Sequence, residues 1–106
     1  MRTVLFAVLP EVVLLDVAGP ADAFRMAAQL VPGSYELQFV GTHSSLRSAV
    51  GLQLSQLQRL PAAVPDHAII VIAGVSSISL DLQSEPVRQL TDWLAKGVRN
   101  ETVTLM

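Results

Sequence analysis

The apolar residues of this chain are concentrated in three short runs and two segments with helical spacing. Residues 3–9 and 67–73 are almost continuously apolar, which is typical of strands buried on both faces of a parallel sheet. Residues 35–42 alternate between apolar and polar side chains. We therefore expect a third strand there, less completely covered than the other two.

The first helical segment is predicted over residues 20–30. Pro20 suits the first turn of a helix, where its missing N–H costs nothing. Four apolar residues then follow at helical spacing and should share one face: Phe24, Ala27, Ala28 and Val31. Pro32 and Gly33 end the segment.

The second helical segment is predicted over residues 85–96. Ser84 occupies a favourable N-cap position, and Gly97 suits the left-handed C′ position that follows many helices. Val87, Leu90 and Leu94 form its apolar stripe, and Trp93 is expected to pack within the helix layer.

Three shorter pieces complete the order of elements. Residues 46–49 and 52–54, separated by Gly51, predict a small hairpin. Residues 57–64 lie before Pro65 and predict a linker or a short helix, and a further strand begins at Thr102. The resulting order β-α-β-(ββ)-β-α-β predicts an α/β fold: a partial flavodoxin-like three-layer sandwich, with a mostly parallel sheet and helices on both faces.

The fold class directs attention to the carboxyl ends of the strands, because ligands bind there in open parallel sheets. The segments at these ends are residues 9–11, 41–43 and 74–76. Gly74, Val75 and Ser76 are thus candidate ligand-binding residues. Ser77 and Ser79 follow them, although serines after a strand more often serve turn formation.

The amino-acid composition excludes several kinds of binding and catalytic site. The 106 residues are 51% hydrophobic and 15% charged, with a formal net charge of −2 and no cysteine. No basic block indicates nucleic-acid binding by this segment itself. Without cysteine, disulfides, thiolate metal sites and a cysteine nucleophile are excluded within these residues. Nothing in the sequence implies a metal or a cofactor.

Neither targeting nor membrane insertion is predicted. The apolar run near the N-terminus resembles the opening of a signal peptide, but Pro10 and Glu11 interrupt it and Asp16 follows. No run of about 18 uncharged apolar residues exists that would form a transmembrane helix. We therefore expect a cytoplasmic protein without membrane contact.

The segment Leu-Leu-Asp-Val-Ala-Gly-Pro-Ala-Asp-Ala-Phe at residues 14–24, placed after a strand and a proline, resembles the ThiJ/PfpI superfamily. This superfamily has the class I glutamine amidotransferase-like fold. The pattern is most similar to the N-terminal domain of AraC-family transcriptional regulators. Residues 35–42, Leu46-Arg47-Ser48, Gly51-Leu52, Trp93-Leu94 and the strand from Val103 fit the same subgroup.

The resemblance implies that the catalytic and DNA-binding parts of complete members lie after these residues. In complete members, the strand corresponding to Val103 onward leads into a nucleophile elbow, usually with a cysteine, and the regulators add a helix-turn-helix domain. Residues 1–106 are thus expected to be the N-terminal part of one such domain, incomplete before the elbow. DNA contact would occur only through a downstream domain that these residues do not contain.

Asp16 is the main candidate for a functional side chain. In superfamily enzymes that hydrate isocyanides, an aspartate of this motif faces the elbow cysteine and can act as a general base. The alternative is structural: Asp16 caps the helix beginning near Pro20 or orders the loop before it. Both roles are compatible with one another.

Gly74 is the second candidate. Superfamily members usually have Pro-Gly-Gly after this strand, and the backbone there lines an oxyanion site. This chain has Ile72-Ala73-Gly74, so one glycine is replaced by Ala73. A positive φ at Ala73 would cost on the order of 1 kcal/mol. A plain strand-end glycine is the alternative interpretation of Gly74.

Other residues carry weaker signals. His43 follows a strand, so it is either a pocket residue or a solvated loop residue, and Glu11 is expected to be solvated. His67 begins a strand and belongs at the opposite end of the sheet.

Three functional hypotheses remain. The first is a ligand-sensing or dimerising domain fragment of an AraC-type regulator, without catalysis, that binds a small molecule or a second protomer. The second is a fragment of a cysteine-dependent hydratase or amidase of the superfamily. The third is a short protein whose sheet is completed by a second chain.

Overall fold

The computed structural model describes residues 1–76 and 83–106. Two helices and seven strands follow one another along the described chain. In order they are β1 (Arg2–Val8), α1 (Leu14–Leu30), β2 (Tyr35–Gly41), β3 (Leu46–Arg47), β4 (Gln53–Leu54), β5 (Gln58–Arg59), β6 (Ile69–Ile72), α2 (Glu85–Gly97) and β7 (Thr104–Leu105).

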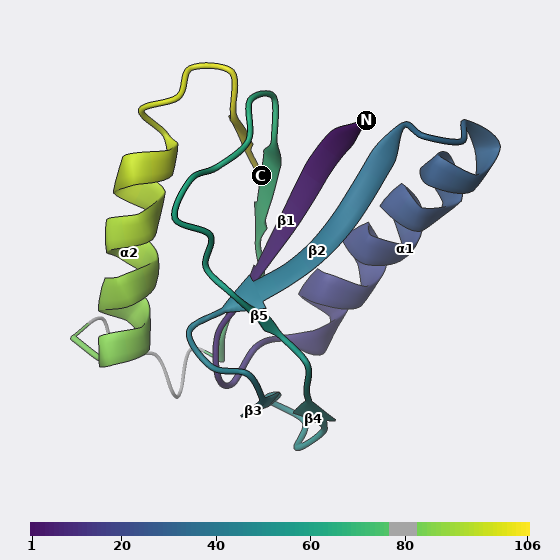
Figure 1. Cartoon of the computed structure of the whole chain (residues 1–106). Coiled ribbons are helices and arrows are strands. Elements are labelled where there is room, and N and C mark those ends of the chain that lie inside the picture. The colour runs from purple at the N-terminus through teal and green to yellow at the C-terminus, as the bar shows by residue number, and fades with distance from the viewer. Residues whose placement is uncertain (77–82) are drawn as a thin grey trace.

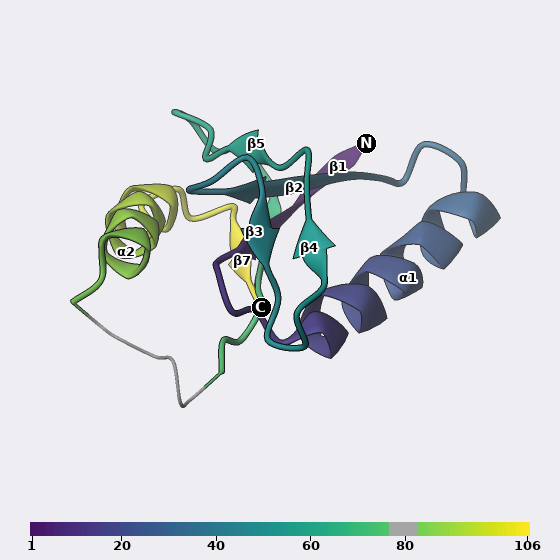
Figure 2. The same cartoon turned by 90° about the horizontal axis from the view of Figure 1, so that it is seen from below.

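Five strands form one sheet in the order β5-β2-β1-β6-β7, and every pairing within it is parallel. The helices lie on opposite sides of this sheet (Figures 1 and 2). This arrangement confirms the predicted α/β class and the three layers. It follows from right-handed crossovers, because the chain moves in opposite directions along the sheet through α1 and through α2.

The layer between α1 and the sheet is built from alternate residues of the strands. Val4, Phe6 and Val8 of β1 belong to this core and are almost completely buried. Phe24 joins α1 to the sheet, with its ring edge-on to Phe6 at 6.3 Å and to Tyr35 at 5.1 Å between centroids. Aromatic edge contacts of this kind add to the burial of apolar area.

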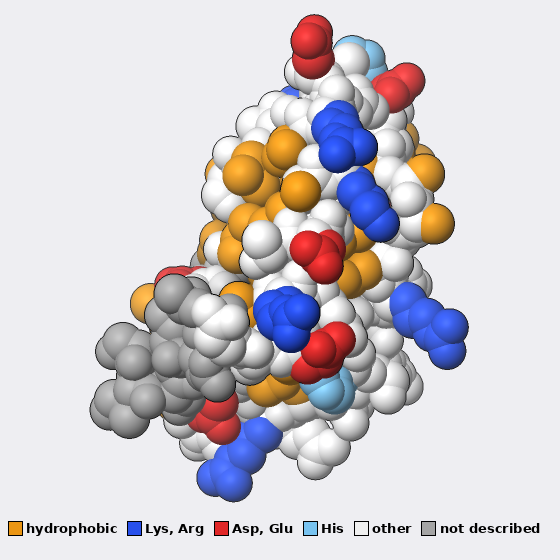
Figure 3. All heavy atoms as spheres, turned by 90° about the vertical axis from the view of Figure 1, so that its left-hand side faces the viewer, with side chains coloured by type: hydrophobic (Ala, Val, Ile, Leu, Met, Phe, Trp, Pro, Cys, Tyr) orange, Lys and Arg blue, Asp and Glu red, His pale blue; other side chains and the backbone are white. Residues whose placement is uncertain are grey.

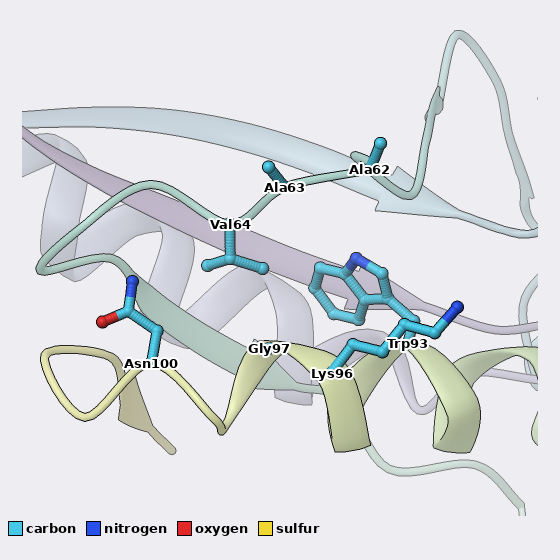
Figure 4. Close-up of a pocket in the computed structure, with 7 residues that line it drawn as sticks. All are labelled: Ala62, Ala63, Val64, Trp93, Lys96, Gly97 and Asn100. Atoms are coloured by element: carbon cyan, nitrogen blue, oxygen red, sulfur yellow. The ribbon is translucent and has the colours of Figure 1, made fainter.

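The opposite layer lies between the sheet and α2. Leu90 and Trp93 are buried there against Leu5, Ala7 and Ile70. Figure 4 shows the indole of Trp93 between α2 and the segment 62–64, around a hollow of about 220 Å³. The indole N–H donates to the carbonyl of Pro61 at 2.9 Å, so the polar atom of this buried ring is paired.

Hydrogen bonds at the amino ends of the strands hold the short strand β7 in place. Arg2 donates to the carbonyl of His67 and to the hydroxyl of Thr104. The backbone N–H of His67 donates to the Thr102 hydroxyl at 2.8 Å. His67 therefore lies at the end of the sheet remote from the candidate ligand site.

The start of α1 corrects the sequence-based boundary. The helix begins at Leu14, six residues before Pro20, so Pro20 lies inside the helix and not in its first turn. Asp16 is consequently a residue of the first turn, and its interpretation as a cap for a helix near Pro20 is wrong. Val31 lies beyond the helix and is 62% exposed, so it does not belong to the apolar face.

Two further predictions are corrected by backbone geometry. Within residues 57–64, expected to form a linker or helix, Gln58 and Arg59 form β5, which pairs with β2. Gly97 is the last residue of α2 and has no positive φ, so it is not a left-handed C′ residue. Ser84 is the N-cap as predicted, but its side chain makes no capping hydrogen bond.

Candidate ligand site at the carboxyl edge of the sheet

The carboxyl ends of β1 and β6 are neighbours, and the chain leaves them in opposite directions. From β1 it passes through α1 to β2, whereas from β6 it passes through α2 to β7 on the other side. Such a reversal of strand order is the point where open α/β sheets bind ligands, because the diverging connections leave a crevice. This position is the strongest topological candidate for a site in the described chain.

Backbone pairing joins the two diverging segments above the sheet. Val12 and Val75 form an isolated antiparallel bridge. The N–H of Val13 donates to the carbonyl of Gly74 at 2.8 Å, and the N–H of Ser76 donates to the carbonyl of Glu11 at 3.0 Å. At this edge the two segments therefore form a floor of peptide groups that are already paired with one another.

Asp16 reaches this floor from the first turn of α1. Its Oδ2 accepts the backbone N–H of Gly74 at 3.1 Å. A Cβ atom added at Gly74 would lie 2.7 Å from the same oxygen. The φ of Gly74 is not positive, so the backbone conformation does not require glycine here. The close approach of the Asp16 carboxylate does. The sequence identified both residues as candidates, and the structure brings them into direct contact.

The contact limits the chemistry of the site. Neither Ala73 nor Gly74 adopts a positive φ, so Ala73 carries no such strain. The N–H of Gly74, which could stabilise an oxyanion, already donates to a carboxylate. Both Asp16 and Gly74 are exposed, and within the described residues Asp16 Oδ1 accepts no hydrogen bond.

Val75 and Ser76 play different parts from Asp16. Both are half-buried, and their backbones form the bridge to residues 11–12. Their peptide groups hold the loop after β6 against the loop after β1. The predicted serines Ser77 and Ser79 lie outside the described residues.

The β3–β4 hairpin closes one side of this edge, a role that the sequence did not indicate. The N–H of Glu11 donates to the carbonyl of Arg47 at 2.8 Å, and the N–H of Ala49 donates to the carbonyl of Val12 at 2.9 Å. Ser48 between them is buried, and its hydroxyl accepts the N–H of Leu52. Glu11, which was expected to be solvated, is half-buried, and its backbone has a φ of 65° and is hydrogen-bonded to the hairpin and to Ser76.

A second, polar hollow lies at the carboxyl ends of β2 and β5. It has a volume of about 250 Å³. Its lining comes from the end of β2 and from the edge strand that sequence patterns did not reveal: Gly41, Thr42, His43, Ser44, Leu57, Gln58 and Arg59. The Thr42 hydroxyl lies 2.8 Å from His43 Nδ1. His43 is exposed, as a solvated loop residue would be, and it also lines this hollow; a binding role for it stays a prediction.

The charge distribution shows no large surface of one sign on the face that carries α2. Figure 3 shows Lys and Arg interspersed with Asp and Glu there, with apolar side chains between them. In the part of the chain that the structure describes, no three His, Cys, Asp or Glu side chains are grouped so as to hold a metal ion. No helix of residues 1–76 and 83–106 is long and apolar enough to cross a membrane.

A solved structure described as "Crystal structure of AraC family transcriptional regulator from Pseudomonas putida" superposes on this chain with a TM-score of 0.70. The two chains share a fold. The superposition covers 91% of this chain at 21% sequence identity. This chain spans 60% of the length of that regulator chain. No protein-family model matches the sequence, and the search of curated proteins finds no match.

Proposed function

We propose that residues 1–106 act as the N-terminal part of a ligand-sensing or dimerising domain of an AraC-type transcriptional regulator, without catalytic activity of their own. The observation that carries the proposal is the shared fold with a chain described as an AraC family regulator, at a TM-score of 0.70 over 91% of this chain. The ThiJ/PfpI-like motif at residues 14–24 supports the same assignment.

The site geometry supports sensing over catalysis. Asp16 offers a carboxylate at the carboxyl edge, but the chain has no cysteine to serve as the nucleophile. The Gly74 N–H is occupied by Asp16, so it does not offer a free donor to an oxyanion. A site of this kind binds a small molecule through the Asp16 carboxylate, with Gly74, Val75 and Ser76 forming the surface beside it.

The partners follow from this assignment. The domain binds a small molecule with hydrogen-bond donors, because a carboxylate only accepts. It associates with a second copy of itself, and DNA is contacted only through a separate downstream domain. The competing function, a fragment of a cysteine-dependent hydratase or amidase, needs a nucleophile from outside these residues.

A thermal-shift experiment tests the sensing part. Small amines, amides and polyols are added singly to the wild-type chain and to Asp16→Asn, and the melting temperature is followed. At a ligand concentration of about 100 times Kd, binding contributes roughly 2.7 kcal/mol to stability and raises the midpoint by about 10 °C or more. Stabilisation of both chains to the same extent would remove Asp16 from the site. Absence of any stabilising compound would count against sensing.

A fusion experiment tests the dimerising part. The chain is joined to a DNA-binding domain that represses a reporter gene only as a dimer. Repression above that of the unfused domain is expected. Thiol-independent turnover of an amide or isocyanide by the chain, abolished by Asp16→Asn, would instead favour an enzyme.

A further inference from the structure

The polar hollow at the carboxyl ends of β2 and β5 is separate from the contact between Asp16 and Gly74. We call it the β2–β5 hollow. Both places lie at the same edge of the sheet but on different strand pairs, because the strand order is β5-β2-β1-β6-β7. Asp16 and Gly74 belong to the ends of β1 and β6. The β2–β5 hollow is therefore a second candidate site with a chemistry of its own.

The backbone fixes the shape of the β2–β5 hollow. Gly41 is paired in register with Arg59, so β2 places no side chain directly opposite Arg59. Position 41 requires glycine because an added Cβ would lie 2.6 Å from the carbonyl oxygen of Val8. The N–H of Leu57 donates to the carbonyl of Ser44 at 2.9 Å, which holds the loop after β2 against the segment before β5. The walls are thus positioned before a ligand arrives, which lowers the cost of binding.

The side chains that line the hollow offer hydrogen-bond donors and include no carboxylate. Arg59 brings a permanent positive charge and a planar fork of N–H groups. Within residues 1–76 and 83–106, its guanidinium makes no hydrogen bond or ion pair. The hydroxyl of Ser44 adds a further donor. A metal cation would meet a positive charge and no carboxylate here, whereas an anion meets a cation and several donors.

Thr42 and His43 together always keep one hydrogen to donate. The Thr42 hydroxyl oxygen lies 2.8 Å from Nδ1 of His43, and either group can be the donor of this hydrogen bond. If the hydroxyl donates to Nδ1, the ring proton is on Nε2 and remains for another acceptor. If Nδ1–H donates to the hydroxyl oxygen, the hydroxyl hydrogen remains instead. The pair therefore supplies a donor at the wall of the hollow in either tautomer of His43.

We propose that the β2–β5 hollow binds a small oxyanion, the carboxylate or phosphate group of a metabolite, with Arg59 as its charged partner. Arginine holds either group through two parallel N–H bonds. The Thr42–His43 pair and the Ser44 hydroxyl then donate to oxygens that Arg59 does not reach. One arginine is too little for a nucleic-acid backbone, whose binding depends on many phosphate contacts.

This site goes beyond the proposed function, because it uses neither Asp16 nor Gly74. It also selects a ligand of the opposite kind: the Asp16 carboxylate accepts hydrogen bonds, whereas the lining of the β2–β5 hollow donates them. The thermal-shift experiment with amines, amides and polyols reports on Asp16 alone. The two sites can therefore fail separately.

A nuclear magnetic resonance titration tests the site with two probes, sodium phosphate and sodium succinate, at constant ionic strength in chloride. At least one probe is expected to shift the backbone amides of residues 42–44 and 57–59 in a saturable way. The probe that binds more tightly identifies the ligand group as phosphate or carboxylate. Arg59→Gln should raise its dissociation constant about tenfold or more, because a charge-assisted hydrogen bond is lost. Arg59→Lys keeps the charge without the fork and should restore only part of the affinity.

Arg88→Gln is the matched control, because Arg88 is exposed on α2, makes no hydrogen bond or ion pair through its described side chain, and lies outside the hollow. It removes the same charge, so the dissociation constant should stay within about twofold. Thr42→Val removes the hydroxyl and should weaken binding severalfold, and circular dichroism confirms that each variant is folded. Equal weakening by Arg59→Gln and Arg88→Gln would indicate general charge attraction and overturn the site. No saturable response to either probe, or shifts confined to other residues, would overturn it as well.

Discussion

The backbone N–H of Gly74 donates to the carboxylate of Asp16 across 58 positions of sequence, with 3.1 Å between nitrogen and Oδ2. This single bond connects the loop after a central strand to the first turn of α1. It is the only place in the described chain where the two principal candidate residues from the sequence touch. Its strength and its glycine requirement can both be measured.

Removal of the Asp16 carboxylate should destabilise the fold. Asp16→Ala loses a charge-assisted hydrogen bond and a negative charge in the first turn of a helix, together worth about 1 kcal/mol at this exposed position. Asp92→Ala is the control, since Asp92 is also exposed in a helix and makes no described hydrogen bond or ion pair. Urea unfolding measures both free energies. Equal values for the two variants would show that the Gly74 contact contributes nothing.

The glycine at position 74 should be coupled to Asp16. Gly74→Ala places a Cβ 2.7 Å from Asp16 Oδ2, so the carboxylate must move and its bond is lost. We expect a loss of about 1 kcal/mol in the wild-type chain. In the Asp16→Ala background the same change should be neutral or slightly stabilising, because the obstacle is gone. A double-mutant cycle by urea unfolding gives the coupling, and purely additive costs would contradict the close approach.

Gly97 should resist replacement although it lies in a helix. Alanine normally gains about 1 kcal/mol over glycine in a helix interior, and part of that gain is expected at Gly97, the last residue of α2. Here the added Cβ would lie 3.2 Å from Val64 Cγ2, and the position is buried. Gly97→Ala is therefore expected to be destabilising in the wild-type chain and stabilising in the Val64→Ala background. Thermal melts of the four chains test this, and stabilisation in both backgrounds would refute the packing constraint.

Trp93→Phe should weaken the attachment of α2 to the segment 61–64. The change removes the N–H donor to the Pro61 carbonyl and part of the buried ring. A loss of about 1–2 kcal/mol is expected, measured by urea unfolding with far-ultraviolet circular dichroism. In the wild-type chain Trp93 is the single tryptophan, so its emission reports this contact alone. Emission that stays unchanged through unfolding would contradict its burial.

The central strands could be predicted from sequence because a short, continuous apolar run is typical of a strand buried on both faces. Residues 3–9 and 67–73 therefore gave β1 and β6 within a few positions. The beginning of α1 could not be predicted, because Gly19 and Pro20 resemble a helix start and the helix instead accommodates proline in its interior. Strand β5 was missed since both Gln58 and Arg59 are exposed on an edge and give no apolar pattern.

In the candidate site, too, some features could be predicted from the sequence and others could not. Asp16 and Gly74 could be named from a family-like motif and from the rule that strand ends carry ligands. Their contact could not be derived, because it depends on where α1 starts and on how closely two segments approach. The hairpin wall at residues 47–49 depends on backbone hydrogen bonds, which leave little trace in the side-chain pattern.

The hydrogen bond between Gly74 and Asp16 lies at one end of a long helix. Helix α1 has 17 residues and is therefore about 25 Å long. If the helix turns about this contact by roughly 5°, the opposite end near Leu30 moves by about 2 Å. The position of the exposed Leu30 is therefore sensitive to the geometry of the contact at the other end of the helix, and a small rearrangement at the sheet edge corresponds to a larger displacement there.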